Sequence, residues 1–203
     1  MAWPDRTQLP YAFDAAGLQG DLAALTGLGW TSHFVKDNYQ GTWDVLPLRS
    51  PAGARHPIQM IYADPSATAF ADTPMLAACP AIRAALAALP FERQSVRLMR
   101  LTPGSVITTH RDHDLDAEQG RARLHIPILT NGGVDFRLNG SRVTMAPGSV
   151  WYLRLSDPHS VANHGGADRI HLVLDVVVND HLRGLIDPEN PQFRGPRRAF
   201  TQG

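Results

Sequence analysis

The sequence contains a single cysteine, Cys79, among 203 residues, so it cannot form an intrachain disulfide or a thiolate metal cluster. It also lacks an excess of charge of either sign, because nineteen Lys and Arg residues balance nineteen Asp and Glu residues. No nucleic-acid partner is therefore expected. No apolar run approaches the roughly 18 residues that span a bilayer, and the polar, proline-containing start is not typical of a signal peptide. These absences predict a cytoplasmic protein without a membrane partner.

The first 94 residues have the texture of helix and loop. Asp14 is a suitable cap for a helix that presents Leu18, Leu22 and Leu25 on one face. A second helical stretch covers about residues 73–89, and Pro80 is expected to divide it because proline breaks an interior turn. At the other end, residues 188–203 are rich in Pro and Arg and predict a poorly packed tail.

From residue 95 the sequence changes to short strand-like runs separated by turn signals. Asn139-Gly140, for example, is typical of a two-residue hairpin turn. The predicted strands cover residues 96–101, 105–112, 123–129, 134–138, 142–145, 149–155 and 169–178. Their number and spacing indicate a closed or sandwiched antiparallel sheet. We expect one mainly β domain with flanking helices (α+β) over residues 1–187, with helical and loop support in 1–94 and a barrel core in 95–180.

Three residues in this half suit a mononuclear iron(II) site. His110 and Asp112 are two positions apart in a predicted strand, so their side chains share a face. Non-haem iron(II) sites use two histidines and one carboxylate. His159 is the best candidate for the third ligand, because the 49 intervening positions leave room for two hairpins. Asp114 is the alternative to Asp112 as the carboxylate.

Further basic residues suit an anionic co-substrate beside the metal. Arg169 opens the last predicted strand, ten positions after His159, and can bind a carboxylate through two parallel hydrogen bonds. Arg123 and His125 share a face of another strand. A dicarboxylate such as 2-oxoglutarate would bind iron at one end and an arginine at the other. Taken singly, each of these residues also suits a surface or core position; their joint order and spacing favour the site.

Several segments resemble the aspartyl/asparaginyl β-hydroxylase family, which includes bacterial free-proline cis-4-hydroxylases. The matching segments are VRLMRLTPG (96–104), HRD (110–112), RLHIP (123–127), WYL (151–153), PHSVAN (158–163) and RIHLVLD (169–175), with weaker matches at YQGTW (39–43) and LRS (48–50). Animal members of the family bind iron with two histidines alone. Asp112 therefore makes this chain more similar to the proline hydroxylase branch.

The resemblance implies a double-stranded β-helix (a jelly-roll or cupin-like barrel) with an N-terminal helical segment. It also implies hydroxylation of an unactivated carbon with iron(II), 2-oxoglutarate and O2, and with ascorbate as a reductant in vitro. Position by position, it assigns iron to His110, Asp112 and His159. The far carboxylate of 2-oxoglutarate would go to Arg169, with Arg123 and His125 beside the co-substrate.

The expected substrate is a free amino acid or an amino-acid-like small molecule, and a homodimer is possible. Candidate substrate contacts are Arg97, Arg100, Arg49 and Trp151, of which Arg97 and Arg100 must lie on opposite strand faces. An Asp, Asn or other side chain in a peptide or protein is the alternative substrate. A non-oxidative cupin metal enzyme and a binding module are the alternatives from other classes. The non-oxidative cupin would not need Arg169.

Overall fold

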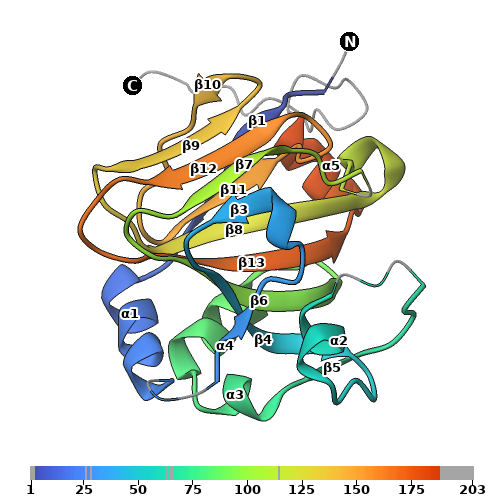
Figure 1. The fold of residues 1–203 in the computed structure, drawn as a ribbon. Helices are drawn as coiled ribbons and strands as arrows, with labels where there is room; N and C mark the ends of the chain where they lie inside the picture. The colour runs from blue at the N-terminus through green and yellow to red at the C-terminus, as the bar shows by residue number, and fades with distance from the viewer. Residues whose placement is uncertain are drawn as a thin grey trace, which may run out of the picture.

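The computed structural model describes residues 3–187 apart from residues 26, 28, 63, 65 and 114. The predicted tail, 188–203, and Asp114 lie outside the described residues. Within the described part, the strands form two antiparallel sheets that pack against each other (Figure 1). This is the predicted jelly-roll architecture of a mainly β protein with flanking helices.

The larger sheet has eight strands and the smaller has five. In spatial order, the larger sheet contains β1 (Arg6–Ala12), β11 (Ser149–Leu153), β8 (Arg121–Leu129), β13 (Arg169–Val177), β6 (Arg93–Leu101), β4 (Trp43–Pro51) and β2 (Thr31–Ser32), with β5 (Phe70–Asp72) beside β4. The smaller sheet contains β10 (Ser141–Arg142), β9 (Val134–Leu138), β12 (His159–Asn163), β7 (Val106–His110) and β3 (Tyr39–Gln40).

The larger sheet is buried on both faces, which creates two cores. Along β13, Leu172 and Leu174 face the outer core, where the sheet packs against α1 (Ala15–Ala24), α4 (Pro80–Ala88) and α5 (Asp180–Ile186). Val173 faces the inner core between the sheets, with Phe136 and Val161 from the smaller sheet. The alternation along the strand therefore directs every second residue of β13 toward the interior of the barrel.

The helical features of the first half are confirmed. Asp14 caps α1, where its carboxylate accepts hydrogen bonds from the Ala16 and Gly17 backbone N–H groups. Pro80 begins a new helix, so the second helical stretch is divided into α3 (Pro74–Ala77) and α4. Two 3-10 turns, η1 (Lys36–Asn38) and η2 (Ala117–Gln119), and the short helix α2 (Pro57–Ile61) lie in the loops. None of the described helices is long and apolar enough to span a membrane.

Residues 1–94, for which the sequence predicts helical and loop support, also supply strands of the barrel. This region supplies β4, which pairs with β6 in the larger sheet, and β1, which pairs with β11 at its edge. Residues on both faces of β4 are buried, so the strand lacks the polar–apolar alternation that marks a half-exposed strand. Pro47 also argues against a strand in this segment, because proline is unusual inside a sheet.

The hairpin prediction at Asn139-Gly140 is confirmed. Both residues have positive φ, 51° and 75°, and the turn joins β9 to β10. The predicted strand over 142–145 is shorter than expected, because pairing with β9 stops at Arg142. The other strands predicted after residue 95 are present with shifted ends, and the segment beginning at His159 is a strand, β12.

Leu172 is fully buried at the centre of the outer core, between β6 and β8. We expect Leu172→Ala to reduce the free energy of unfolding by about 2–5 kcal/mol, because it leaves a cavity where two layers meet. Urea denaturation measures the loss. Arg137→Ala, on the exposed side of β9, is the control and should change stability by less than about 0.5 kcal/mol. Equal effects of the two substitutions would contradict this account of the core.

Candidate active site

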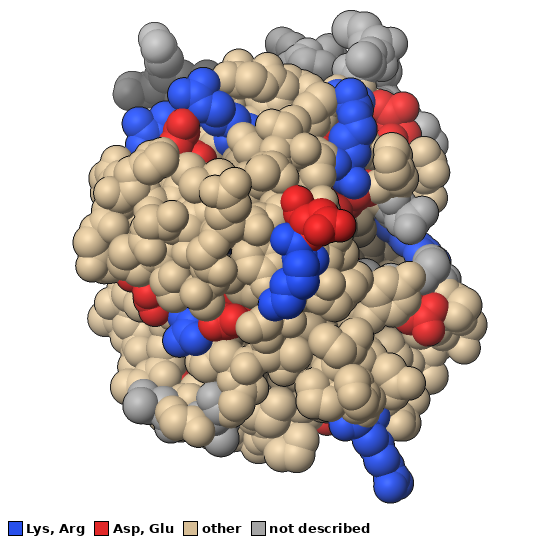
Figure 2. All heavy atoms as spheres, in the orientation of Figure 1, with Lys and Arg blue, Asp and Glu red and all other residues tan. Residues whose placement is uncertain are grey.

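A cavity of about 340 Å³ opens between the two sheets. The inner faces of β6, β8 and β13 form one wall, and β7 and β12 form the opposite wall. Residues before β4 and around α2 complete it, including His33, Phe34 and Tyr62. On the face seen in Figure 2, acidic and basic side chains are scattered among other residues and form no large patch of one sign.

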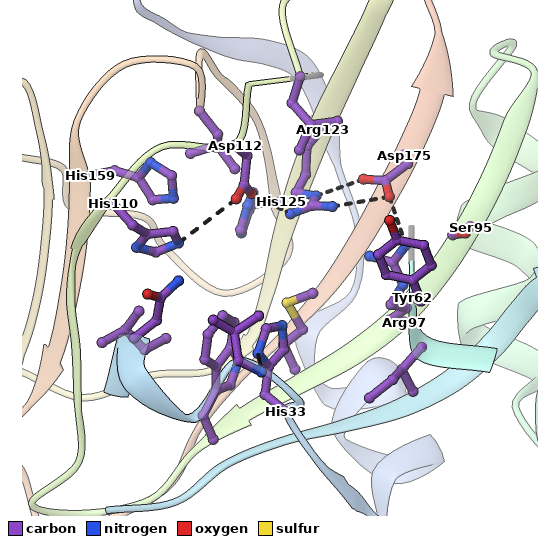
Figure 3. Close-up of a pocket in the computed structure, with 18 of the residues that line it drawn as sticks. His33, Tyr62, Ser95, Arg97, His110, Asp112, Arg123, His125, His159 and Asp175 are labelled. Atoms are coloured by element: carbon purple, nitrogen blue, oxygen red, sulfur yellow. Dashed lines mark hydrogen bonds and ion pairs between the residues drawn. The ribbon is translucent and has the colours of Figure 1, made fainter. Parts of the chain in front are cut away.

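Three potential metal ligands converge on one wall of this cavity. His110 ends β7, and His159 begins β12 directly opposite it in the antiparallel register. Asp112 follows two residues after His110 (Figure 3). One ligand atom from each of the three lies within 4.8 Å of the others. The chain passes through β8, β9, β10 and β11 before it returns beside β7, which brings together residues 49 positions apart; only β9 and β10 of these four described strands form a hairpin.

Both histidines are oriented with one ring nitrogen free. The Nδ1 atoms of His110 and His159 lie 2.8 and 3.0 Å from the backbone carbonyl oxygens of Thr108 and Asp157. A carbonyl only accepts, so each Nδ1 carries the proton and each Nε2 has a lone pair available for a metal. Burial lowers the pKa of His159 to about 4, which keeps its imidazole neutral near pH 7. Two neutral imidazoles and one carboxylate form the donor set that suits iron(II).

Arg123 fixes the position of the carboxylate ligand. Its Nη1 donates to Oδ2 of Asp112 at 2.7 Å, while Oδ1 of Asp112 lies 3.9 Å from Nε2 of His110. One carboxylate oxygen is thus engaged by the guanidinium and the other faces the histidine. This arrangement favours binding of the metal through a single oxygen, which leaves coordination positions for other ligands.

Arg123 is itself held by a second, buried carboxylate. Asp175 of β13 accepts hydrogen bonds from Nε and Nη2 of Arg123 at 2.6 and 3.1 Å. The same carboxylate accepts one from Nη2 of Arg97 at 2.8 Å. Burial alone would raise the pKa of Asp175, but the two arginines outweigh it and lower that pKa to about 2. The four side chains Arg97, Asp175, Arg123 and Asp112 therefore form one charged chain that ends at the candidate metal ligands.

Arg169 is a buried cation of a different kind. Its side chain is almost fully buried, and among the described residues its hydrogen-bond partner is His171, whose Nδ1 accepts from Nη2 of Arg169 at 2.9 Å. Among the described residues no carboxylate pairs with it, and its buried Nε has no hydrogen-bond partner. Burial lowers the pKa of Arg169 to about 9. A buried guanidinium without an anion is costly, so the position suits an anionic ligand.

Two neutral histidines adjoin this arginine. Burial holds the pKa of His125 and of His171 well below the usual value. His125 lines the cavity, and its buried Nε2 has no partner among the described residues. Unpartnered polar atoms on Arg169 and His125, together with the three ligand side chains, fit a metal-bound carboxylate co-substrate.

Seven of the residues singled out in the sequence lie around the cavity: His110, Asp112, His159, Arg123, His125, Arg169 and Arg97. Three others do not line it. Arg100 faces outward, where it binds Asp44 at 2.6 Å and stacks on Trp30. Arg49 pairs with Asp72 at 2.7 Å, and Trp151 donates from Nε1 to Ser149 Oγ. Arg97 and Arg100 thus occupy opposite faces of β6, as their odd spacing requires.

Two parts of the site were not predicted from the sequence. Asp175 ends the matching segment RIHLVLD (169–175) but was given no role, although it holds both Arg97 and Arg123. The second part is a stack in which the His33 ring lies between Trp43, 3.6 Å away centroid to centroid, and Phe34, at 4.7 Å. Burial lowers the pKa of His33 to about 3. Nothing in the spacing of His33 marks it, because a loop brings it to the cavity.

Comparison with known proteins places this geometry in a family. A family model described as Aspartyl/Asparaginyl beta-hydroxylase matches residues 21–178. L-proline cis-4-hydroxylase of Rhizobium meliloti (strain 1021) is 29% identical over 197 residues, covering 93% of this chain and 68% of the relative. The chain therefore belongs to the aspartyl/asparaginyl β-hydroxylase family, which makes it an oxidoreductase rather than a non-oxidative cupin or a binding module.

Solved structures agree on the fold. A 2OG-Fe(II) oxygenase family oxidoreductase from Burkholderia pseudomallei has a TM-score of 0.53 at 17% identity, covering 85% of each chain. A Pseudomonas putida prolyl-4-hydroxylase has a TM-score of 0.50 at 15% identity, covering 86% of this chain and 93% of that one. At such identities the likeness supports the jelly-roll fold alone.

Removal of the Asp175 charge tests the buried chain of ion pairs. We expect Asp175→Asn to lower the free energy of unfolding by about 3–5 kcal/mol at pH 7, because Arg97 and Arg123 lose a buried partner. Denaturant titration measures this. Asp72→Asn, which removes an exposed partner of Arg49, is the matched control and should cost less than about 1 kcal/mol. A loss of unfolding free energy no greater than in the control would contradict the proposed contribution of Asp175 to stability.

The low pKa of Asp175 also predicts a pH dependence. A folded-state value of about 2 lies below the ordinary 3.8, so the folded state binds fewer protons than the unfolded state in this range. The stability that Asp175 contributes is complete above about pH 4 and is lost as the pH falls toward about 2. Unfolding of the wild type should therefore be more acid-sensitive across this window than unfolding of Asp175→Asn. If the unfolding free energies of the wild type and of Asp175→Asn changed equally with pH, the low pKa of Asp175 would be contradicted.

Proposed function

We propose that this protein is an iron(II)- and 2-oxoglutarate-dependent dioxygenase that hydroxylates an unactivated carbon of a free amino acid or a similar small molecule. His110, Asp112 and His159 would hold the iron. One observation carries the proposal. The cavity that contains these three ligands also contains the buried Arg169, which pairs with no carboxylate among the described residues.

Each residue of the site has a separate role in this chemistry. Bound iron would supply the oxygen activation that amino-acid side chains cannot provide. His110 and His159 offer their Nε2 atoms, and Arg123 keeps one oxygen of Asp112 turned toward them. Arg169 would bind the far carboxylate of 2-oxoglutarate, with His125 beside the co-substrate. Burial of this end keeps water away from the bound ligand.

Two observations support a small substrate. A cavity of about 340 Å³ lies at the small end of the roughly 300–1,000 Å³ range of ligand pockets. The Rhizobium relative is named L-proline cis-4-hydroxylase and is similar over most of this chain. An Asp or Asn side chain in a peptide remains the alternative, and the substrate panel below separates the two. We further propose that residues 1–187 form one domain; the cytoplasmic location, the homodimer, O2 use and the benefit of ascorbate stay predictions.

Succinate formation tests the proposal. Protein purified without oxygen is given iron(II), 2-oxoglutarate, ascorbate and O2, with and without free amino acids, including proline, or short Asp- and Asn-containing peptides. We expect iron-dependent succinate that increases with a free amino acid. Stimulation by peptides alone would favour the alternative substrate. The absence of iron-dependent succinate from protein shown to hold one metal ion would contradict the oxygenase.

Arg169 provides a specific prediction. Arg169→Met should raise the KM for 2-oxoglutarate by about thirtyfold or more, because loss of one member of a buried charge pair costs about 2–5 kcal/mol. Steady-state succinate formation at varied 2-oxoglutarate concentration measures the change. Arg142→Met, at an exposed position on β10, is the control and should leave this KM within about twofold. An unchanged KM in Arg169→Met would exclude Arg169 as the co-substrate arginine.

A further inference from the structure

Arg97 is a second buried arginine with unused hydrogen-bonding capacity in the cavity. Its side chain is 2% exposed, and Nη2 binds Asp175. Its buried Nε has no partner among the described residues. Asp175 is shared, since it also accepts two hydrogen bonds from Arg123. One carboxylate thus serves two guanidinium groups, and Arg97 is only partly neutralised.

Charge balance shows that one positive charge remains after iron and co-substrate have bound. Arg97, Arg123 and Arg169 carry three positive charges, while Asp112 and Asp175 carry two negative charges. Iron(II) adds two positive charges and 2-oxoglutarate adds two negative charges, so the surplus of one is unchanged. Of the other charged lining residues, the half-buried Asp64 and Arg121 carry opposite charges and leave the sum unchanged, and Arg111 is exposed, where water screens its charge. This step rests on the proposed function.

Arg97, to which we assign the surplus positive charge, lies away from Arg169, the proposed co-substrate arginine. In the pairing of β6 with β13, Arg97 is opposite Val173 and Arg169 is opposite Leu101, four residues along the strand. Four residues correspond to about 13 Å. The Arg97 guanidinium also points to Asp175, farther still from Arg169. A five-carbon dicarboxylate, with four carbon–carbon bonds of about 1.5 Å each, is too short to occupy both positions.

We propose that Arg97 binds the carboxylate of the substrate, and that the substrate is therefore an acid with a free carboxylate rather than a residue inside a peptide. A single negative charge balances the surplus, whereas a phosphate dianion would exceed it. Figure 3 shows Arg97, Ser95 and Asp175 on the side of the cavity away from His110 and His159. The substrate body would then lie between Arg97 and the metal ligands, along Met99, which follows Arg97 on the same face of β6.

Matched acids and amides test this directly in the wild-type protein. Each of the twenty common L-amino acids is assayed for stimulation of succinate formation, and every active one is compared with its carboxamide, such as L-proline with L-prolinamide. We expect the amide to have a kcat/KM at least thirtyfold lower than the acid. Equal activity of acid and amide would overturn the proposal. So would stimulation by none of the acids while iron-dependent basal turnover persists, an outcome that leaves the iron- and 2-oxoglutarate-dependent part of the proposed function intact.

A pair of variants on one strand assigns the effect to Arg97. Arg97→Met should reduce the preference for acid over amide at least tenfold, and Arg97→Lys should retain part of it. Arg100→Met is the matched control, because Arg100 lies three residues later on the outer face of β6, paired with Asp44; it should keep the full preference. If Arg97→Met raised the KM for 2-oxoglutarate and kept the acid preference, Arg97 would serve the co-substrate and the proposal would fail. Should that variant not fold, the wild-type acid and amide comparison decides.

Discussion

The geometry of the site depends on Arg123, which bridges two carboxylates of different function. Its Nη1 engages Asp112 in the ligand set, and its other nitrogens engage the buried Asp175. A guanidinium bound on both sides has little freedom, so the free oxygen of Asp112 is held near the histidines. The charges of Asp112, Arg123 and Asp175 are paired with one another, which offsets the several kcal/mol that an unpaired buried charge costs.

Because buried charges need partners, anionic ligands are also expected at two other places in the cavity. Arg169 and Arg97 each have a buried Nε without a partner among the described residues. They lie at different positions along the β6–β13 pair, on either side of the cavity centre. The β-sheet fixes the distance between the two arginines, because side chains on one face of a strand recur at every second residue. A shift of one residue in the strand pairing would turn these side chains to the other face. The fold thus positions the two proposed anion sites around the proposed metal centre.

Much of the site could be predicted from the sequence, because most of its residues are in strands or close to a strand end. The two-residue period relates His110 to Asp112 and Arg123 to His125, and the antiparallel return of the chain brings His159 opposite His110. The contribution of the first half could not be predicted in this way. Strand β4 is buried on both faces and contains Pro47, and the His33 stack depends on a loop. The pairing partners of Arg97, Arg100 and Arg123 also depend on which strands become neighbours, which periodicity does not determine.

The central claim is that His110, Asp112 and His159 hold an iron(II) that binds 2-oxoglutarate. The most direct measurement is the visible charge-transfer absorption that a 2-oxo acid gives when it binds iron(II), recorded without oxygen during titration with iron. The account predicts a band that saturates at one iron per chain in the wild type and is absent from His159→Ala and Asp112→Ala. Iron bound at one per chain without this band, or an undiminished band in both variants, would contradict it.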